Sequence, residues 1–159
     1  METRIGYGYD VHQLAEGLRL TLGGVVVTEE FGCVAHSDGD VLLHAVCDAL
    51  LGAAALGDIG RHFPDTDPAY EGASSLALLR AVCALLAEAG WAPVNVDATL
   101  VLERPKIAPF VAEMRANIAA AMGVDEDAVS VKATTSERLG FVGSGEGVTA
   151  HAVSLLRRI

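Results

Sequence analysis

The chain has 159 residues, of which 52% are apolar and 20% charged, a composition typical of a globular domain and not of a disordered chain. Its 11 Lys and Arg residues against 21 Asp and Glu residues give a net charge of −10, which repels nucleic-acid backbones and anionic membrane surfaces. The sequence also contains no apolar run of the roughly 18 residues that a spanning helix needs. We therefore expect neither a nucleic-acid partner nor a membrane partner.

The N-terminal sequence METRIGYGYDVH has neither the apolar core of a signal peptide nor the Arg- and Ser-rich character of a transit peptide. Cys33, Cys47 and Cys83 show no CxxC spacing and lie among Val, Ala and Leu, which is typical of buried thiols in a reducing compartment. We expect a cytoplasmic protein. Because no Pro- or Ser-rich linker divides the sequence, we interpret residues 1–159 as a single domain.

The first forty residues favour extended structure in three segments: 4–9, 18–22 and 25–28. The glycine pair at 23–24 stands between the last two segments and predicts a β-hairpin turn. A Leu- and Ala-rich helix is expected from about Asp40 to Ala55, with Ser37 or Asp38 as its N-terminal cap and Gly57 at its end.

The second half of the chain alternates between helical and strand periodicity. The expected elements, in chain order, are a helix at 75–89, a strand at 94–102, a helix from Pro109 to Gly123, and strands at 129–132 and 148–156. A Gly-rich loop, GFVGSGEG, separates the last two strands. This order predicts an α+β fold class, with helices packed on one face of a mixed β-sheet.

The segment Asp10-Val11-His12 carries two metal-ligand side chains at positions i and i+2, which project from the same face of an extended strand. His44, on the first expected helix, is a third candidate. One Asp and two His could hold Zn²⁺ and leave a fourth position open, the pattern of catalytic zinc sites. The alternatives are an ordinary hydrogen-bonded Asp–His pair and a histidine that is simply part of the core.

The segment HSDGDVLLH, residues 36–44, stands at the start of the first expected helix. Backbone N–H groups and the helix dipole favour a phosphate there, and His36 and Ser37 could complete the anion site. Equally, Ser37 could cap the helix while His36 stays in solvent. Asp48, one turn after His44, could orient its imidazole ring or simply face solvent.

Two further segments are rich in polar residues. The loop GDIGRHFPDTDP, residues 57–68, is either a binding loop or a series of Asx turns between two helices. The segment KATTSE, residues 132–137, could bind phosphate through Thr134 and Thr135 and Mg²⁺ through Glu137. In the simpler interpretation, its hydroxyl groups cap the next turn.

Taken together, these segments resemble the 2-C-methyl-D-erythritol 2,4-cyclodiphosphate synthases, the cyclases of the non-mevalonate route to isoprenoids. The matching pieces are RIGYGYDVHQL, HSDGDVLLHAVCDALLGAAALGDIG, HFPDTDPAY, ERPKI and VKATTSERLGFVGSGEG, in the family's order. The resemblance implies a metal-dependent lyase that converts 4-diphosphocytidyl-2-C-methyl-D-erythritol 2-phosphate to the cyclic diphosphate and releases CMP. It also implies a homotrimer with active sites between subunits.

The resemblance also assigns roles to individual residues. It implies Zn²⁺, or a similar divalent metal, on Asp10, His12 and His44, one ion per subunit, and Mg²⁺ or Mn²⁺ between Glu137 and the substrate diphosphate. The implied catalytic residues are His36, Thr135 and Glu137. The implied contacts of the small-molecule cytidine diphosphate substrate are Asp10, Val11, His12, His36, Ser37, Asp58, Ile59, Gly60, Phe63, Pro64, Asp65, Thr66, Asp67, Leu102, Glu103, Arg104, Pro105, Lys106, Ile107, Ala108, Thr134, Thr135, Ser136, Glu137 and Phe141.

One residue departs from the family's pattern: Ser144 stands where many members carry an Arg, in a loop that lines an axial cavity for isoprenoid diphosphates. We therefore expect weaker binding of geranyl or farnesyl diphosphate. Two other functions remain as alternatives to the cyclase. One is a phosphohydrolase that uses the same metal site to activate water, and the other is a metal or nucleotide sensor without turnover.

Overall fold

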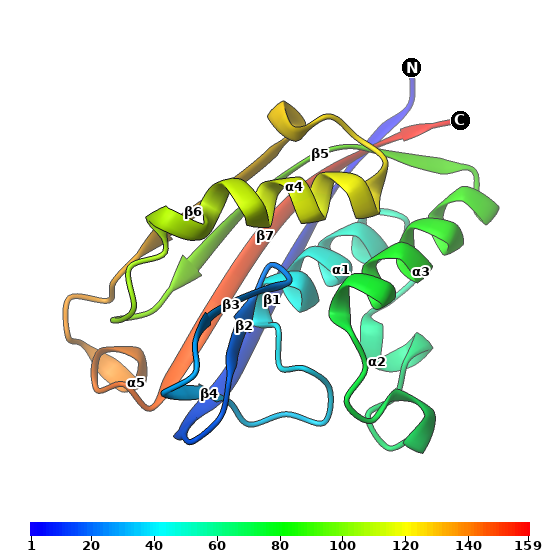
Figure 1. The fold of residues 1–159 in the computed structure, drawn as a ribbon. Helices are drawn as coiled ribbons and strands as arrows, with labels where there is room; N and C mark the ends of the chain where they lie inside the picture. The colour runs from blue at the N-terminus through cyan, green and yellow to red at the C-terminus, as the bar shows by residue number, and fades with distance from the viewer.

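The computed structural model describes residues 1–159, except for the side chain of Tyr70. Its centre is a five-stranded sheet in the order β4-β1-β7-β5-β6 (Figure 1). β5 and β6 are parallel, and the other neighbouring strands are antiparallel. The sheet is therefore mixed, as expected. The strands are β1 (Thr3–Glu16), β4 (Phe31–Cys33), β5 (Trp91–Val101), β6 (Val129–Thr134) and β7 (Gly147–Arg158).

Three long helices cover one face of this sheet, which confirms the predicted α+β class (Figure 1). They are α1 (Val41–Ala53), α3 (Ser75–Glu88) and α4 (Val111–Met122). Shorter helices lie in the connections: α2 (Ile59–His62), η1 (Pro68–Tyr70), η2 (Ala108–Phe110), η3 (Glu126–Ala128) and α5 (Gly140–Gly143). Among the described residues, no helix is both long and apolar enough to cross a membrane.

The expected hairpin is present as β2 (Leu20–Leu22) and β3 (Val25–Thr28), which form a separate two-stranded sheet. The first strand, however, is longer than the predicted 4–9, and β4 was not expected at all. β1 pairs with β7 from Thr3 opposite Arg157 to Gln13 opposite Gly147. β1 therefore extends beyond residue 9 because its backbone pairs with the long strand β7, although residues 10–13 lack the hydrophobic pattern typical of a strand.

The expected cap of the first helix is wrong: Asp40, and neither Ser37 nor Asp38, caps α1. The Asp40 carboxylate accepts a hydrogen bond from Leu43 N at 3.0 Å. It also accepts hydrogen bonds from the backbone N–H groups of the hairpin turn at 23–24. The reason lies in Gly39, whose left-handed backbone (φ 71°) turns the chain between Asp38 and the helix.

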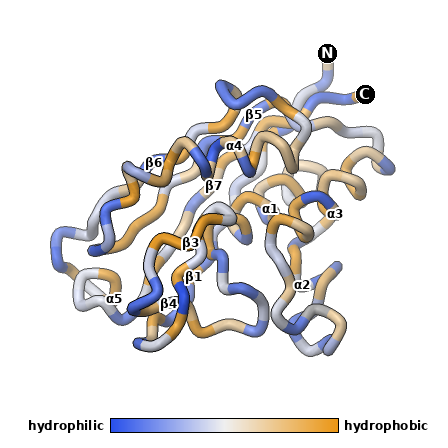
Figure 2. Tube along the Cα trace, in the orientation of Figure 1, coloured by the Kyte–Doolittle hydropathy of each residue, from blue (hydrophilic) through white to orange (hydrophobic). Residues whose placement is uncertain are grey.

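The backbones of β1 and α1 are in direct contact. A Cβ atom added to Gly8 would lie 1.9 Å from the carbonyl oxygen of Ala45, and one added to Gly6 would lie 1.9 Å from that of Ala49. The close approach requires glycine on the strand. The helix is buried and predominantly hydrophobic along its length (Figure 2). This contact fixes the strand that carries Asp10 and His12 against the helix that carries His44.

The other face of the sheet carries apolar and aromatic side chains that are exposed in the single chain. They are Ile5, Tyr7, Tyr9 and Val11 on β1 and Val153 on β7. Across the two strands, Tyr7 Oη lies 2.7 Å from His151 Nδ1. An exposed apolar patch on one sheet face is typical of a surface that another protein chain covers.

Candidate metal centre and binding pockets

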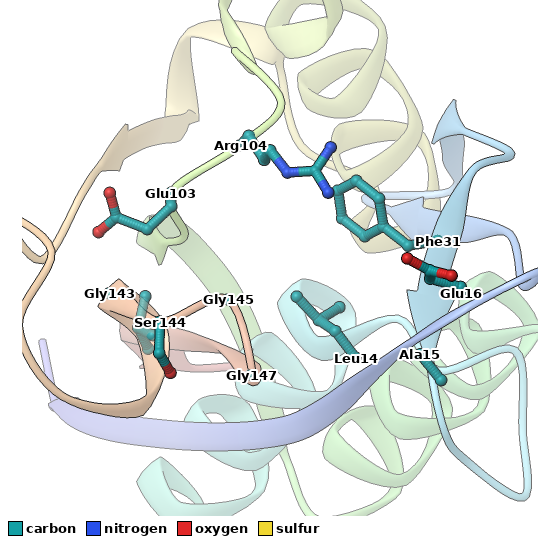
Figure 3. Close-up of a pocket in the computed structure, with 11 residues that line it drawn as sticks. Leu14, Ala15, Glu16, Phe31, Glu103, Arg104, Gly143, Ser144, Gly145 and Gly147 are labelled. Atoms are coloured by element: carbon teal, nitrogen blue, oxygen red, sulfur yellow. The ribbon is translucent and has the colours of Figure 1, made fainter.

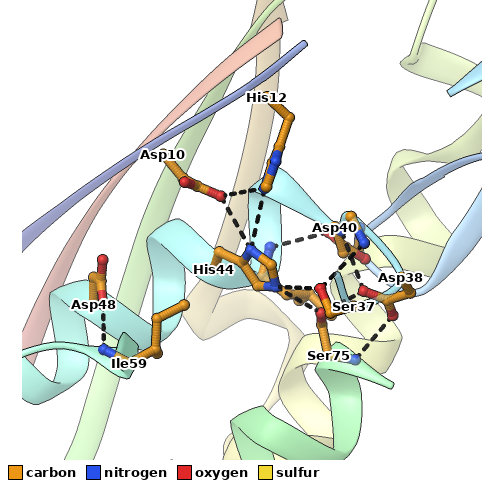
Figure 4. Close-up of polar contacts among 12 residues, drawn as sticks. Asp10, His12, Ser37, Asp38, Asp40, His44, Asp48, Ile59 and Ser75 are labelled. Atoms are coloured by element: carbon orange, nitrogen blue, oxygen red, sulfur yellow. Dashed lines mark hydrogen bonds and ion pairs between the residues drawn. The ribbon is translucent and has the colours of Figure 1, made fainter. Parts of the chain in front are cut away.

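Asp10, His12 and His44 converge at the junction of β1 and α1 (Figure 4). Asp10 Oδ2 lies 2.9 Å from His12 Nε2 and 3.1 Å from His44 Nδ1. The two ring nitrogens are 3.3 Å apart. The sequence prediction that these three side chains meet is therefore confirmed. Alternation along β1 turns Asp10 and His12 toward the helix and Val11 away from it.

This group of three has the donor set of a divalent metal site. One ligand atom from each residue lies within 4.8 Å of the others, so a single ion could reach all three. Burial alone would raise the pKa of Asp10, but hydrogen bonds from His12 and His44 and their charges lower this pKa to about 2. The carboxylate is therefore ionised at neutral pH, as a metal ligand must be.

The second nitrogen of His44 faces two hydroxyl groups and not Asp48. His44 Nε2 lies 3.0 Å from Ser75 Oγ and 3.3 Å from Ser37 Oγ. Of the two roles left open for Asp48, the one in which it orients the His44 ring is wrong, because the Asp48 carboxylate accepts a hydrogen bond from Ile59 N at 2.8 Å (Figure 4). Asp48 instead anchors the start of α2.

A pocket of about 460 Å³ opens beside the candidate metal centre. It brings together many of the residues predicted to bind the metal or the substrate: His12, His36, Ser37, His44, Ile59, Gly60, Phe63, Pro64 and Asp65. The sequence analysis missed three of its apolar lining residues, Val34, Ala35 and Leu78.

Two predicted residues of the 57–68 segment cap short helices. Asp58 accepts a hydrogen bond from Arg61 N and caps α2, while Asp67 accepts one from Ala69 N and caps η1. The Asx-turn interpretation therefore holds for these two carboxylates. The backbone oxygen of Asp67 lies 3.3 Å from His36 Nε2. Thr66 does not line the pocket that the structure describes.

A second pocket, of about 420 Å³, lies at the ends of β5 and β6. The predicted residues that line it are Leu102, Glu103, Pro105, Lys106, Ile107, Ala108, Thr134 and Thr135. Val111, Val131, Lys132 and Ala133 complete the lining and were not predicted. The pocket shares no lining residue with the pocket at the metal centre. Within the described chain, the two groups of predicted site residues are therefore separate.

Arg104 does not line this second pocket and lies against Phe31 (Figure 3), whereas Glu103 lines both the second pocket and a further one. The Arg104 guanidinium lies 4.5 Å from the centre of the Phe31 ring, a cation–π contact. Together with Ser144, these residues line a third pocket of about 300 Å³. Ser144 Oγ itself lies 2.9 Å from Glu146 Oε2, to which it can donate a hydrogen bond.

The turn after β6 carries Thr135 and Glu137 in a constrained conformation. Glu137 and Arg138 both have left-handed backbones, with φ of 55° and 62°. The Glu103 carboxylate braces the turn, because it accepts hydrogen bonds from Ser136 N at 3.0 Å and Arg138 N at 3.4 Å. Left-handed non-glycine residues are uncommon and concentrate at functional sites. The Glu137 carboxylate is exposed, where a ligand could reach it.

The fold and the site together define the class: an α+β protein with a candidate three-ligand metal centre beside a binding pocket. The model of the YgbB family matches residues 3–157, and the chain belongs to that family. A 2-C-methyl-D-erythritol 2,4-cyclodiphosphate synthase of Chloroherpeton thalassium is 63% identical over 98% of this chain and 99% of the relative. One of Pseudomonas aeruginosa is 63% identical over 96% and 98%.

Solved structures of the same kind share the fold. A 2C-methyl-D-erythritol-2,4-cyclodiphosphate synthase in a CDP-bound form has a TM-score of 0.89 and 40% identity, over 97% of this chain and 100% of that chain. The bifunctional IspDF of Campylobacter jejuni has a TM-score of 0.96 and 42% identity. That match covers 99% of this chain, which spans 43% of the length of the bifunctional protein.

Proposed function

We propose that this chain converts 4-diphosphocytidyl-2-C-methyl-D-erythritol 2-phosphate to 2-C-methyl-D-erythritol 2,4-cyclodiphosphate with release of CMP. It is thus a metal-dependent cyclising lyase of the non-mevalonate route to isoprenoids. The observation that carries the proposal is the convergence of Asp10, His12 and His44 beside a pocket lined by His36, Ser37 and five predicted residues of the 59–65 segment. Relatives about 63% identical carry the name of this synthase.

The metal-centre pocket is assigned to the methylerythritol end of the substrate. Asp10, His12 and His44 would hold a Zn²⁺ ion, which supplies Lewis acidity beside the phosphate. His36 and Ser37, which line the same pocket, are assigned to phosphate contacts. The N-terminus of α1 does not contribute to this phosphate site, since the Asp40 carboxylate already accepts the hydrogen bond of Leu43 N there.

The pocket at β5 and β6 is assigned to the cytidine diphosphate end. Lys106 supplies a positive charge on a flexible stem, and Thr134 and Thr135 supply hydroxyl donors for phosphate oxygens. Glu137 follows in the braced turn and is assigned to Mg²⁺ or Mn²⁺, for which the substrate phosphates would complete the coordination.

The reaction is an attack by the 2-phosphate of the substrate on its own β-phosphorus. Both reacting groups belong to one molecule, so the chain does not need a nucleophilic side chain. Catalysis then consists of holding the two ends of the substrate close together and neutralising phosphate charge. A protein of net charge −10 must supply the positive charge locally, through Lys106 and bound cations.

We also propose that the active enzyme is a homotrimer whose sites lie between subunits. The two assigned pockets share no lining residue within one chain, yet a single substrate must contact both. The exposed apolar face of β1 and β7 supports an interface with other copies. We place this enzyme in the cytoplasm, an assignment that the three free cysteines support.

Product analysis tests the proposed reaction. The protein is incubated with the cytidyl substrate, Zn²⁺ and Mg²⁺, and the products are identified by mass spectrometry. Cyclisation gives CMP and a diphosphate that is lighter by one water than the hydrolysis product. An acyclic diphosphate would identify a phosphohydrolase instead. Binding of CMP with no turnover would identify a sensor.

Subunit mixing tests the shared site. His44→Ala removes a metal ligand and Lys106→Ala weakens the nucleotide pocket, so each variant alone should be inactive. Refolded together in equal amounts, they would form trimers in which about a quarter of all sites combine two intact halves. Activity should therefore return on mixing. Mixed trimers that form but remain inactive would place both halves of a site in the same subunit.

A further inference from the structure

A buried chain of hydrogen bonds leads away from the metal centre to a carboxylate. His44 Nε2 lies 3.0 Å from Ser75 Oγ, and Ser75 Oγ in turn donates a hydrogen bond to Asp38 Oδ1 (Figure 4). Ser75 is the first residue of α3 and is fully buried. The chain of contacts therefore joins the loop before α1, the start of α3 and a candidate metal ligand on α1.

The direction of each hydrogen bond follows from the carboxylate. An ionised carboxylate only accepts hydrogen bonds, so the single hydroxyl proton of Ser75 must point to Asp38. Ser75 Oγ can then act only as an acceptor toward His44. The ring nitrogen Nε2 must therefore carry a proton, so Nδ1, which faces Asp10, is the nitrogen that can give up its proton to a metal ion.

The other ring nitrogen, Nδ1, is the one that faces the metal centre. His44 Nδ1 lies 3.1 Å from Asp10 Oδ2 and 3.3 Å from His12 Nε2. A histidine can coordinate a metal only through a nitrogen that carries no proton. The direction of the hydrogen bonds thus matches what the metal centre requires.

We propose that Asp38 and Ser75 are positioning residues that set the tautomer of His44, and through it the affinity of the metal centre. The inference rests on the proposed metal site but concerns two residues outside it. Neither residue lines the pocket at the metal centre, so neither is expected to touch the substrate.

Asp38 is itself held in place by backbone groups on two elements. Its Oδ2 accepts a hydrogen bond from Ser75 N at 2.9 Å, and its Oδ1 accepts one from Asp40 N at 3.2 Å. Its own N–H donates to Ala73 O at 3.2 Å. The carboxylate cannot turn away from Ser75 without losing these bonds. A fixed carboxylate gives the hydroxyl proton a fixed direction.

The substitution Asp38→Asn tests the direction of the hydrogen bonds between His44, Ser75 and Asp38 with almost no change in side-chain volume. The amide must face one of the two backbone N–H groups with its own NH₂ group. Keeping the shorter bond, to Ser75 N, places the NH₂ group toward Ser75 Oγ. The amide then donates to Ser75, Ser75 donates to His44 Nε2, and the ring proton moves to Nδ1. The metal-binding nitrogen is thereby blocked.

Two measurements follow the change. In the metal-free protein, the ¹⁵N chemical shifts of a neutral histidine ring report which nitrogen carries the proton. The parent should show a proton on Nε2, whether or not Nδ1 also donates to Asp10, and Asp38→Asn should leave the proton on Nδ1 alone. Zinc affinity, measured by competition with a chromophoric chelator, should fall by about 10- to 100-fold in the variant, the usual effect of losing a partner that orients a metal ligand.

Asp48→Asn is the matched control. It removes one negative charge from a residue near His44 on α1. The Asp48 side chain, however, accepts a hydrogen bond from Ile59 N and takes no part in the hydrogen bonds between His44, Ser75 and Asp38. Its zinc affinity and its His44 tautomer should stay close to those of the parent. Ser75→Ala, which deletes the hydroxyl group, is the second variant. It should lower zinc affinity and leave His44 as a mixture of tautomers.

The outcomes separate this inference from the proposed metal site. A parent protein that binds no zinc would remove the proposed metal, while the tautomer measurement would still decide the role of Asp38 and Ser75. If the parent binds zinc but both variants keep its affinity and its tautomer, the inference is overturned. An equal loss of affinity in Asp48→Asn would also overturn it, because loss of charge would then account for the effect.

Discussion

The contact between β1 and α1 makes Gly8→Ala a sharp test of how the metal centre is built. An added Cβ would lie 1.9 Å from Ala45 O and 2.7 Å from Ala49 N, and both are backbone atoms. An ordinary contact needs at least 3.4 Å. The strand and helix must therefore separate by about 1.5 Å, because neither side chain rotation nor loop movement can relieve the overlap.

The expected cost is near the upper end of the range for overpacked cores, about 3 kcal/mol in the free energy of unfolding. Zinc affinity should fall too, since Asp10 and His12 follow Gly8 on the strand and His44 precedes Ala45 on the helix. Urea denaturation measures the first effect and chelator competition the second.

Gly52→Ala is the control for this substitution on the same helix. Its nearest neighbour for an added Cβ is Tyr7 O, at 3.9 Å, which is an ordinary contact. Since alanine favours helix, the variant should gain up to about 1 kcal/mol of stability. If Gly8→Ala loses less than about 1 kcal/mol and keeps the parent's zinc affinity, the backbone contact does not determine the geometry of the centre.

Three further outcomes are expected. In the metal-free protein the pKa of Asp10 is lowered to about 2, and that of His44 is raised by Asp10 despite its burial. The two shifts should therefore stabilise the fold most between pH 3.8 and pH 6.5, the ordinary pKa values of Asp and His. This stabilisation should fall at lower pH as Asp10 is protonated and at higher pH as His44 loses its proton. His44→Ala should remove the alkaline decrease in a series of thermal melts. Glu137→Gln should weaken the Mg²⁺ dependence of turnover and leave zinc content unchanged, and an Mg²⁺ titration that overlays the parent's would exclude the assignment. Ser144→Arg, which replaces the hydroxyl bonded to Glu146 by a charged group, should strengthen farnesyl diphosphate binding in calorimetric titrations, and equal binding by both proteins would contradict this.

Local patterns in the sequence were sufficient to predict the elements with clear periodicity. α3, for example, ends one residue short of its predicted end, and α4 ends at Met122, directly before the predicted stop at Gly123, whose left-handed backbone (φ 69°) forms the cap. Alternation along β1 also correctly placed Asp10 and His12 on one face. These outcomes depend only on residues that are neighbours in the sequence.

What could not be predicted depends on contacts between distant segments. Asp40 caps α1 because it also bonds the hairpin turn at 23–24, a contact that no local pattern reports. Asp48 has the helical spacing to reach His44, yet its carboxylate bonds the start of α2. In the sequence, Ser75 is an ordinary residue in the first turn of a helix. Only the packing of α3 on α1 brings its hydroxyl group to His44.

The exposed face of β1 and β7 has a consequence for how the protein behaves at different concentrations. Ile5 and Tyr7 are 76% and 60% exposed in the single chain. If other copies cover them, association removes this surface from water only when copies meet. Protein concentration then becomes a variable of stability, as it is for any obligate oligomer. Dilution would weaken the fold and the shared sites together, with no change in sequence or solvent.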